Sequence, residues 1–399
     1  MRILILTDDF PPTSFGGAGI VAFNQARELA KMGHKVSVVT TTQNKNEEGV
    51  SVINGLEVSR IYANYQERYR AYFSLYNPQT VSRIRKILNE KKPDVVHAHN
   101  IHYYLSYHTL KTAKEVCNRV VFTAHDTLLY SYGKVKDESH LSWRKEFKTY
   151  RFRFNLFRNI IIRRYLGYVD CVVAVSESLA RALNNNGITD VSVIHNGIDA
   201  NAWTSNRELQ DEFKTKYGLK DKKVILFSGR LSPAKGAMVT VRALLEIICK
   251  IPNAILLVVG QKNKASQAML DMAIGSGASG NIVFTGWLDR EKIKLAYFCS
   301  DVVVVPSIYL DPFPTVNLEA MASKKPIVGT CWGGTSEAVL DGFNGYIVDP
   351  NNADVLAEKI LDLLKNPEKS KKFGANGFTK VGQDFSLAKQ VDKYLSLYR

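Results

Sequence analysis

The stretch Lys223-Val224-Ile225-Leu226-Phe227-Ser228-Gly229-Arg230-Leu231-Ser232-Pro233-Ala234-Lys235-Gly236 begins as an apolar run and continues through a basic loop into a helical pattern. It starts the second of two series in which short runs rich in Val and Ile alternate with helical patterns. Such runs are typical of parallel strands that are buried on both faces. Because the alternation occurs twice, the sequence predicts an α/β protein with two doubly wound, Rossmann-like domains.

The expected strands divide between the two series. Those of the first series are 3–7, 35–40, 94–98, 120–124, 171–175 and 191–194, and those of the second are 223–227, 255–259, 282–285, 302–305, 327–329 and 346–348. The turn-forming pair Asn196-Gly197 marks the expected boundary. We therefore predict an N-terminal domain of residues 1–196, a C-terminal domain of residues 197–383 and a last helix of residues 384–399. Ligands of such sheets bind beyond the carboxyl ends of the strands, which predicts a site where the two sheets face a shared cleft.

Length, composition and charge narrow the class of protein. The 399 residues are 45% apolar and 23% charged, as in an ordinary globular protein, and no 18-residue apolar run occurs. The N-terminus lacks the pattern of a signal peptide, and the five cysteines are scattered without metal-binding spacing. These features predict a cytoplasmic protein with reduced cysteines.

The net charge of +15 is concentrated in the first half of the chain. Residues 1–196 carry 27 basic and 17 acidic residues, and the segment 144–168 alone has eight cations and one acid, Glu146, interleaved with aromatic residues. A surface of this kind could face the phosphates of a nucleotide, a nucleic acid or an anionic membrane.

Two cations are expected in the loop after strand 223–227. Arg230 can bind a diphosphate through two parallel N–H groups, and Lys235 adds a compact charge next to a helix N-terminus. The alternative is a solvated basic turn. The sequence G-x-x-x-x-G-K-[ST] of a P-loop is absent, which disfavours a P-loop NTPase.

Two carboxylates follow strand 302–305. Asp311 lies in the expected loop, where it can accept from sugar hydroxyls, and Glu319 lies one turn into the next helix, where it can accept from a ribose diol. The alternative is a capping role for Asp311 and a surface position for Glu319. Together with the two cations, the carboxylates suit a ligand that has a polyhydroxylated part and an anionic part, as a nucleotide sugar does.

Gly16 and Gly17 precede the first expected helix, where their backbone N–H groups could approach a phosphate. The sequence from Gly17 to Ala22 also fits the dinucleotide pattern G-x-G-x-x-A. However, the long loop from Asp8 to Phe15 precedes it, and the second strand ends without an acid for a ribose, so an NAD site is disfavoured. A simple tight turn remains the other interpretation.

His125 follows strand 120–124, at the position where an imidazole would face the site and donate to a sugar hydroxyl or to developing charge. A structural histidine at the end of a strand is the alternative. The crowded residues His97, His99, His102 and His108 have the spacing of neither a zincin nor a zinc finger, so we interpret them as non-metal residues. No Asp-x-Asp occurs, which argues against a sugar transferase that holds its diphosphate through a metal.

The order Gly16-Gly17, His125, Arg230, Lys235, Asp311 and Glu319 resembles that of the retaining GT-B glycosyltransferases of family 4, the glycosyltransferase group 1 class. The resemblance implies that Arg230 and Lys235 bind the donor diphosphate, that Glu319 binds the ribose and that Asp311 and His125 act at the transferred sugar. It implies a metal-independent reaction without a cofactor, and a last helix that crosses back onto the first domain. The further residues that we assign to donor binding are Gly16, Gly17, Gly286, Leu288, Phe313, Pro314, Thr315 and Val316.

The chain departs from the family pattern at two positions. Asp311 replaces the usual glutamate, and Pro314 replaces a glycine and so removes a backbone N–H group. Both changes lie where the sugar is expected, so the identity of the sugar does not follow from the family.

The function predicted is transfer of a sugar from a nucleotide-diphosphate sugar to a saccharide or lipid-linked acceptor, as in polysaccharide biosynthesis. The segment 144–168 is interpreted as a peripheral membrane contact on the inner face of the membrane, with a helix packed on its own domain as the alternative. A nucleotide-sugar epimerase and a basic nucleic-acid-binding protein are the competing functions. No nucleic-acid-binding motif supports the latter.

Overall fold

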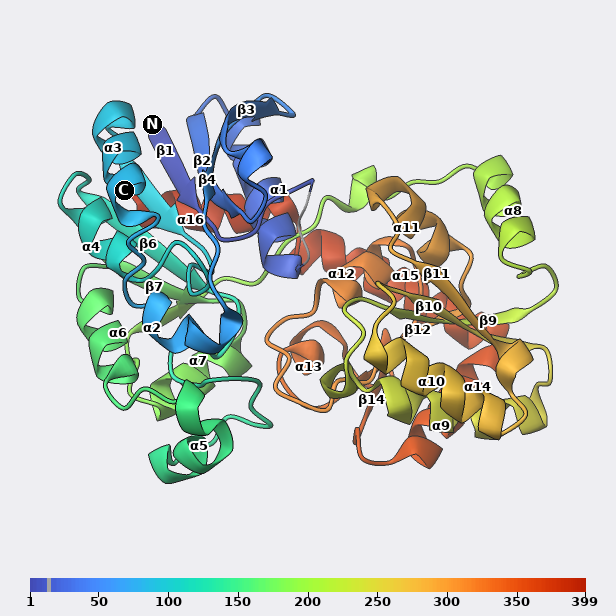
Figure 1. The fold of residues 1–399 in the computed structure, drawn as a ribbon. Coiled ribbons are helices and arrows are strands. Elements are labelled where there is room, and N and C mark those ends of the chain that lie inside the picture. Colours follow the sequence, from blue (N-terminus) through green and yellow to red (C-terminus); the bar gives the residue numbers. More distant parts are fainter. Residues whose placement is uncertain (13–15) are drawn as a thin grey trace. The chain divides into compact units, whose positions relative to one another are not determined.

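The computed structural model describes residues 1–12 and 16–399, so that residues 13–15 of the loop after the first strand lie outside the described residues. It divides into two compact units, Met1–Asn196 together with Leu387–Arg399, and Gly197–Ser386 (Figure 1). The first division falls at Asn196, where the sequence places the boundary. The second falls at Leu387, within the segment 384–399 that was expected to form the last helix.

Within the described residues, the first unit contains one sheet in the order β3-β4-β2-β1-β5-β6-β7-β8. All neighbouring strands are parallel except β3 and β4. The strands are β1 Arg2–Leu6, β2 Lys35–Thr42, β3 Gly49–Ile53, β4 Leu56–Tyr62, β5 Val95–Ala98, β6 Arg119–Ala124, β7 Cys171–Ala174 and β8 Val191–Val193. The helices are α1 Gly17–Lys31, α2 Arg70–Phe73, α3 Val81–Lys91, α4 His108–Lys114, α5 Trp143–Tyr150, α6 Arg158–Leu166, α7 Glu177–Asn185 and α16 Leu387–Tyr398.

The second unit contains a parallel sheet in the order β11-β10-β9-β12-β13-β14. Its strands are β9 Lys223–Ser228, β10 Ala254–Val259, β11 Ile282–Gly286, β12 Val302–Val305, β13 Ile327–Thr330 and β14 Gly345–Val348. Its helices are α8 Arg207–Lys216, α9 Ala237–Lys250, α10 Lys264–Gly275, α11 Arg290–Phe298, α12 Thr315–Ala322, α13 Thr335–Ala338, α14 Ala353–Lys365 and α15 Pro367–Asp384. The prediction of two doubly wound α/β domains is confirmed.

The strands form because their side chains are buried on both faces. Every residue of β12 and of β10 is buried, and both are runs of aliphatic residues, as expected of the interior of a parallel sheet. Helix α16 joins the core of the first unit through Leu387, Val391 and Tyr394, which pack in the same cluster as residues of β1 and α1. The end of the chain is therefore part of the first core.

The sequence did not predict strands β3 and β4. Strands β3 and β4 form a hairpin whose turn is Asn54-Gly55, with both residues at positive φ. This pair is a strong hairpin signal between alternating apolar residues, because both positions of such a turn need positive φ. The hairpin extends the sheet by two strands beyond β2.

Strand order changes direction at one position in each sheet. In the first unit this position lies between β1 and β5, and in the second it lies between β9 and β12. Loops that leave neighbouring strands in opposite directions open a crevice at such a position. Most residues assigned to the site from the sequence follow these strands or their neighbours, whereas Gly286 and Leu288 lie at the end of β11 and just after it.

Candidate functional site

The loops after β9 and β12 are packed directly against each other in the second unit. The amide of Ile308 donates to the carbonyl oxygen of Ala234 at 2.8 Å. Gly236 has a φ of 80°, and a Cβ atom there would lie 1.9 Å from the carbonyl oxygen of Pro306. Glycine is therefore required where the turn that carries Lys235 approaches the end of β12.

Lys235 and Asp311 form an ion pair across this junction. The ammonium of Lys235 lies 2.5 Å from Oδ2 of Asp311, and the Asp311 side chain is only 6% exposed. The same carboxylate accepts from the hydroxyl of Ser307 at 2.6 Å and from that of Tyr309 at 3.0 Å. A buried carboxylate needs such partners, and three donors here compensate for its removal from water.

The ion pair leaves capacity on both partners. An ammonium has three N–H donors, and the Lys235 side chain is still 25% exposed, so donors remain for a second anion. A carboxylate has about four lone-pair sites, of which Asp311 uses three. Lys235 is thus held in place and can still bind a ligand.

The backbone of Asp311 is also held. It forms an isolated bridge with Gly333, and its carbonyl oxygen accepts from the amide of Gly334 at 2.9 Å. Gly333 has a φ of 80°, and a Cβ atom there would lie 2.1 Å from that carbonyl oxygen. The loops after β12 and β13 therefore fix the position of the carboxylate.

Glu319 lies on α12 and contacts α11. Its Oε2 accepts from the hydroxyl of Tyr297 at 2.5 Å, and the Thr315 side chain also donates to the carboxylate. Burial raises the pKa of Glu319, while these hydrogen bonds and the charge of Arg290 oppose the shift. The two hydroxyl donors leave part of the carboxylate's acceptor capacity unused beside a buried tyrosine.

The other residues of the second unit that the sequence assigns to donor binding differ in exposure. Arg230 is exposed and begins the loop that leads to Lys235, whereas Gly286 ends β11 and Leu288 is buried in the loop that follows it. The segment before and at the start of α12 contains the buried residues Phe313 and Pro314 and the half-buried residues Thr315 and Val316.

In the first unit, Gly16 and Gly17 lie at the start of α1. The amide of Gly16 donates to Oδ2 of Asp9 at 3.1 Å, and Gly17 is the exposed first residue of the helix. The structure thus places a carboxylate next to the amide that was assigned to a phosphate.

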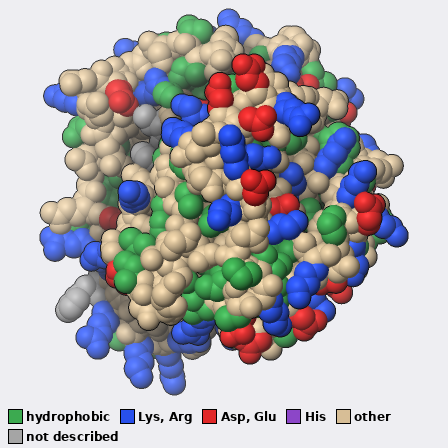
Figure 2. Space-filling model, turned by 90° about the vertical axis from the view of Figure 1, so that its right-hand side faces the viewer, with side chains coloured by type: hydrophobic (Ala, Val, Ile, Leu, Met, Phe, Trp, Pro, Cys, Tyr) green, Lys and Arg blue, Asp and Glu red, His purple; other side chains and the backbone are tan. Residues whose placement is uncertain are grey.

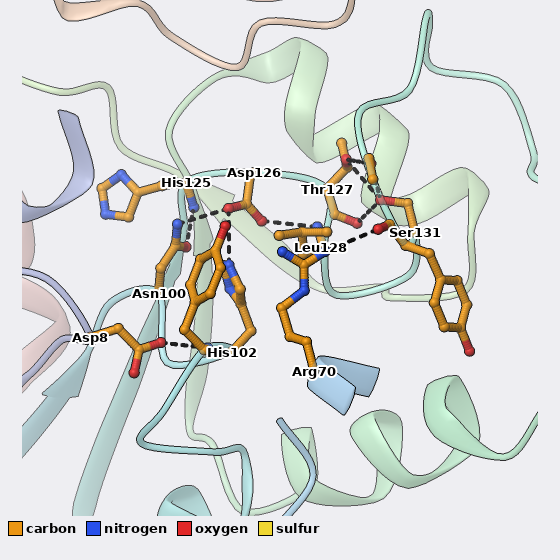
Figure 3. A network of polar contacts seen from close by, with 12 residues as sticks. Asp8, Arg70, Asn100, His102, His125, Asp126, Thr127, Leu128 and Ser131 are labelled. Carbon is orange, nitrogen blue, oxygen red and sulfur yellow. Dashed lines mark hydrogen bonds and ion pairs between the residues drawn. The ribbon is translucent and has the colours of Figure 1, made fainter. Parts of the chain in front are cut away.

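His125 and Asp126 follow β6 and contact the end of β5 (Figure 3). The side chain of Asn100 accepts from the amide of His125 at 3.2 Å and donates to Oδ2 of Asp126 at 2.8 Å. Nε2 of His102 lies 3.6 Å from the same carboxylate oxygen. Burial lowers the pKa of His102 and of His125 to about 4, so both imidazoles are neutral at neutral pH.

Asp8, at the end of β1, holds the loop that carries His102. Its carboxylate accepts from the backbone amides of Tyr103, Tyr104 and Leu105 at 2.6–2.8 Å, and Figure 3 shows Asp8 beside His102. Burial raises the pKa of Asp8 to about 7, and the three amide bonds act in the opposite direction. The carboxylate fixes the loop at the carboxyl end of β5.

Sequence reasoning missed several of these groups, namely Asp8, Asn100, Asp126, Tyr297, Ser307 and Tyr309. Asp8 and Asn100 could have been found, because they follow expected strands at the two sides of the change in strand order. Tyr297 could not, because it lies 22 residues before Glu319 on another helix. Within residues 1–12 and 16–399, no group of three or more His, Cys, Asp or Glu side chains is arranged to hold a metal ion.

The segment 143–168 carries exposed apolar and basic residues, which together we call the α5–α6 face. Its exposed apolar residues are Trp143, Phe147, Leu156, Phe157 and Ile160, and its exposed cations are Arg144, Lys145, Lys148, Arg151, Arg153, Arg163 and Arg164. Ile162 lies in the segment that we expect to contact a membrane, but it is buried. Phe154, in the same segment, packs on Tyr132. The side chain of Phe152 lies outside the described residues.

The face shown in Figure 2, which lies at the right of Figure 1, differs from the α5–α6 face in its distribution of charge. There, Lys and Arg side chains stand among Asp and Glu side chains. On the α5–α6 face, the one acid, Glu146, is half-buried and accepts from the amide of Tyr132 at 3.2 Å. Among the residues described, no helix is both long enough and apolar enough to cross a bilayer.

Two protein-family models match the chain and together extend over both units. The model described as Glycosyltransferase Family 4 matches residues 15–202, and the model described as Glycosyl transferases group 1 matches residues 210–380.

Related proteins match over nearly the whole chain. An uncharacterised glycosyltransferase of Methanocaldococcus jannaschii is 29% identical over 90% of this chain and 87% of its own length. The glycogen synthase of Mycobacterium tuberculosis is 24% identical over 96% of this chain and 91% of its own length. Among solved structures, sucrose-phosphate synthase from Thermosynechococcus elongatus is similar with a TM-score of 0.79 and 19% identity, covering 100% of this chain and 98% of that one.

The raised pKa of Glu319 predicts how its replacement changes stability with pH. A carboxyl whose pKa is higher in the folded state than in the unfolded state binds more protons when the protein is folded. Its contribution to the free energy of unfolding therefore falls as the pH rises from the unfolded pKa through the folded pKa. We expect Glu319→Gln to lose no stability relative to the wild type at pH 8 and to become less stable than it toward pH 5. Urea unfolding at both pH values measures this difference. A variant that is most destabilised at pH 8 would contradict the assignment.

Proposed function

The chain belongs to family 4 of the glycosyltransferases, in the group 1 class, and we propose that it transfers a sugar from a nucleotide-diphosphate sugar to an acceptor hydroxyl with retention at the anomeric carbon. The observation that carries this proposal is the Lys235–Asp311 ion pair at the junction of the β9 and β12 loops. It supplies an oriented cation with free donors at the position where open α/β sheets bind ligands.

The main chemical task is to stabilise the charge that grows on the departing nucleoside diphosphate. Lys235 is already oriented by Asp311, so its remaining N–H groups can meet phosphate oxygens with little reorganisation. Arg230, which begins the same loop, is proposed to bind a second pair of phosphate oxygens. Gly16 and Gly17 are proposed to add backbone contacts to the diphosphate or the sugar.

Glu319 is proposed to bind the ribose. Tyr297 donates to Oε2 and Thr315 also donates to the carboxylate, and because a carboxylate has about four lone-pair sites, capacity remains to accept from a ribose hydroxyl. Gly286, Leu288, Phe313, Pro314, Thr315 and Val316 would complete the donor site. This arrangement places an acid for the pentose and a cation for the diphosphate in the same unit.

Asp311 is proposed to act at the sugar through its one remaining lone-pair site. Because it is buried and bound to Lys235, it is poorly suited to attack the anomeric carbon. We therefore propose a front-face route: the bond from the anomeric carbon to the phosphate oxygen breaks, the acceptor oxygen bonds to the same face, and the acceptor's proton passes to the departing phosphate. His125 is proposed to donate a hydrogen bond at the transferred sugar.

Replacing Lys235 by Met should reduce kcat by about 10²–10³, because it removes one donor that stabilises the departing charge. Lys262→Met, at an exposed lysine of the same unit, is the matched control and should keep full activity. The assay follows both release of the nucleoside diphosphate and the glycosylated acceptor. Wild-type activity in a folded Lys235→Met variant would refute the assignment. Isomerisation of the donor without any acceptor would instead favour an epimerase.

The reaction is proposed to need no metal and no cofactor, because Lys235 and Arg230 supply the positive charge that a diphosphate requires. Transfer should therefore continue at an unchanged rate after dialysis against EDTA. Loss of activity that added Mg²⁺ or Mn²⁺ restores would contradict this proposal.

The acceptor is proposed to be a saccharide or a lipid-linked sugar, with the α5–α6 face in contact with an anionic membrane. Exposed aromatic and aliphatic side chains beside several cations match the composition of interfacial helices. Each Lys or Arg near an anionic surface contributes about 1 kcal/mol to attraction. This contact would give the protein a peripheral location on the inner face of the membrane.

Co-sedimentation with vesicles checks the membrane contact. Vesicles that contain phosphatidylglycerol should retain the protein more strongly than those of phosphatidylcholine alone, and Phe157→Ser should weaken retention. Val52→Ser, at an exposed valine of the same unit, is the control and should have no effect. Equal, negligible binding to both vesicles would reject the contact, and a salt-dependent shift of oligonucleotides would point to nucleic acid instead.

A further inference from the structure

Three histidine rings are stacked behind the carboxyl ends of β5 and β6. The ring centroids of His97 and His99 are 4.3 Å apart, and those of His99 and His125 are 5.2 Å apart. His97 and His99 are fully buried, and burial lowers their pKa values. Only His125, at the front of the stack, is partly exposed.

The back of the stack is fixed by the last helix. Nδ1 of His97 lies 2.6 Å from the hydroxyl of Tyr398 and accepts from the side-chain amide of Gln25 at 3.1 Å. Its Nε2 lies 2.8 Å from the hydroxyl of Thr123. Because Nδ1 accepts, the proton of this neutral ring is on Nε2, which donates to Thr123. His97 is thus held on both edges.

The front of the stack depends on one hydrogen bond. Nδ1 of His99 lies 2.8 Å from Nε2 of His125, and Nε2 of His99 is buried without a partner among the residues that the structure describes. If His125 donated, Nε2 of His99 would have to carry a proton and would be a buried N–H group without an acceptor. Such orphaned donors are rarer than unsatisfied acceptors in folded proteins. The arrangement therefore favours donation from His99 Nδ1 to His125 Nε2.

We propose that His99 is a positioning residue that holds His125 as the neutral tautomer with its proton on Nδ1, so that this N–H can act as a hydrogen-bond donor. The inference rests on the proposed function of His125 at the transferred sugar. A neutral imidazole donor can bind a sugar hydroxyl oxygen or developing charge, and its direction is set by the partner of the other nitrogen. His97 and Tyr398 fix the ring of His99 from behind.

The tautomer can be read without any substrate. In the full-length chain labelled with ¹⁵N-histidine, the nitrogen shifts of His125, assigned by their loss in His125→Gln, should show a protonated Nδ1. In His99→Phe, which cannot donate, the His125 proton should move at least partly to Nε2. A wild-type His125 protonated on Nε2, or an unchanged tautomer in His99→Phe, would overturn the proposal.

Kinetics supply the second readout. His99→Phe should lower kcat by about tenfold with little change in the KM of the donor, as expected for loss of about one hydrogen bond in the transition state. His99→Asn, whose amide nitrogen can replace Nδ1 as a donor, should restore part of the rate and the Nδ1–H tautomer. Val173→Ala, in the adjacent strand β7, controls for loss of core packing.

The two readouts separate the inference from the function on which it rests. If the protein transferred no sugar but His125 still lost its Nδ1 proton in His99→Phe, the positioning role would stand and the proposed function would fail. If transfer occurred and the tautomer did not respond to His99, the positioning role would fail alone. If His99→Phe did not fold, His99→Asn would provide the test, because a His125 protonated on Nε2 in that variant would overturn the proposal.

Discussion

The ion pair between Lys235 and Asp311 is the contact on which the proposed donor site depends. It joins the loops that follow β9 and β12. These strands are neighbours in the sheet, but the start of β12 lies 74 residues after the end of β9 in the sequence. Removing either partner would leave a charge without compensation in a largely buried position, which is more costly than the loss of an exposed pair. The pair therefore fixes both the local fold and the position of the cation that we assign to the diphosphate.

In each unit, polar groups follow the strands where the strand order changes direction, but the chemistry of these groups differs between the units. In the second unit, the loops beside the change in strand order carry a cation and carboxylates, which we propose bind the donor. In the first unit, the corresponding loops carry neutral imidazoles and amides. Burial lowers the pKa of His125, and the hydrogen bond with His99 sets which ring nitrogen of His125 carries the proton. Helix α16, which belongs to the second half of the sequence, closes the core behind these histidines. The reactive groups of each unit are thus supported by buried residues of that unit.

The sequence predicted the buried strands well because short Val and Ile runs such as 302–305 are typical of strands that are buried on both faces of a parallel sheet. It failed at the β3–β4 hairpin, although Asn54-Gly55 carried a clear turn signal. It suggested Lys235, Asp311 and Glu319 through their order, but the roles of Tyr297 and His99 as partners of Glu319 and His125 could not be inferred. Those contacts depend on which loops and helices meet in space, and spacing along the chain does not determine that.

The most direct test is a crystal structure with the nucleoside diphosphate that raises the Tm of the protein most. At 100 times its Kd, such a ligand should add about 2.7 kcal/mol to the free energy of unfolding. The account predicts phosphate oxygens at about 2.7–3.2 Å from the ammonium of Lys235 and a ribose hydroxyl at hydrogen-bonding distance from Glu319. A nucleotide bound away from both residues, with its diphosphate contacting neither Lys235 nor Arg230, would contradict it.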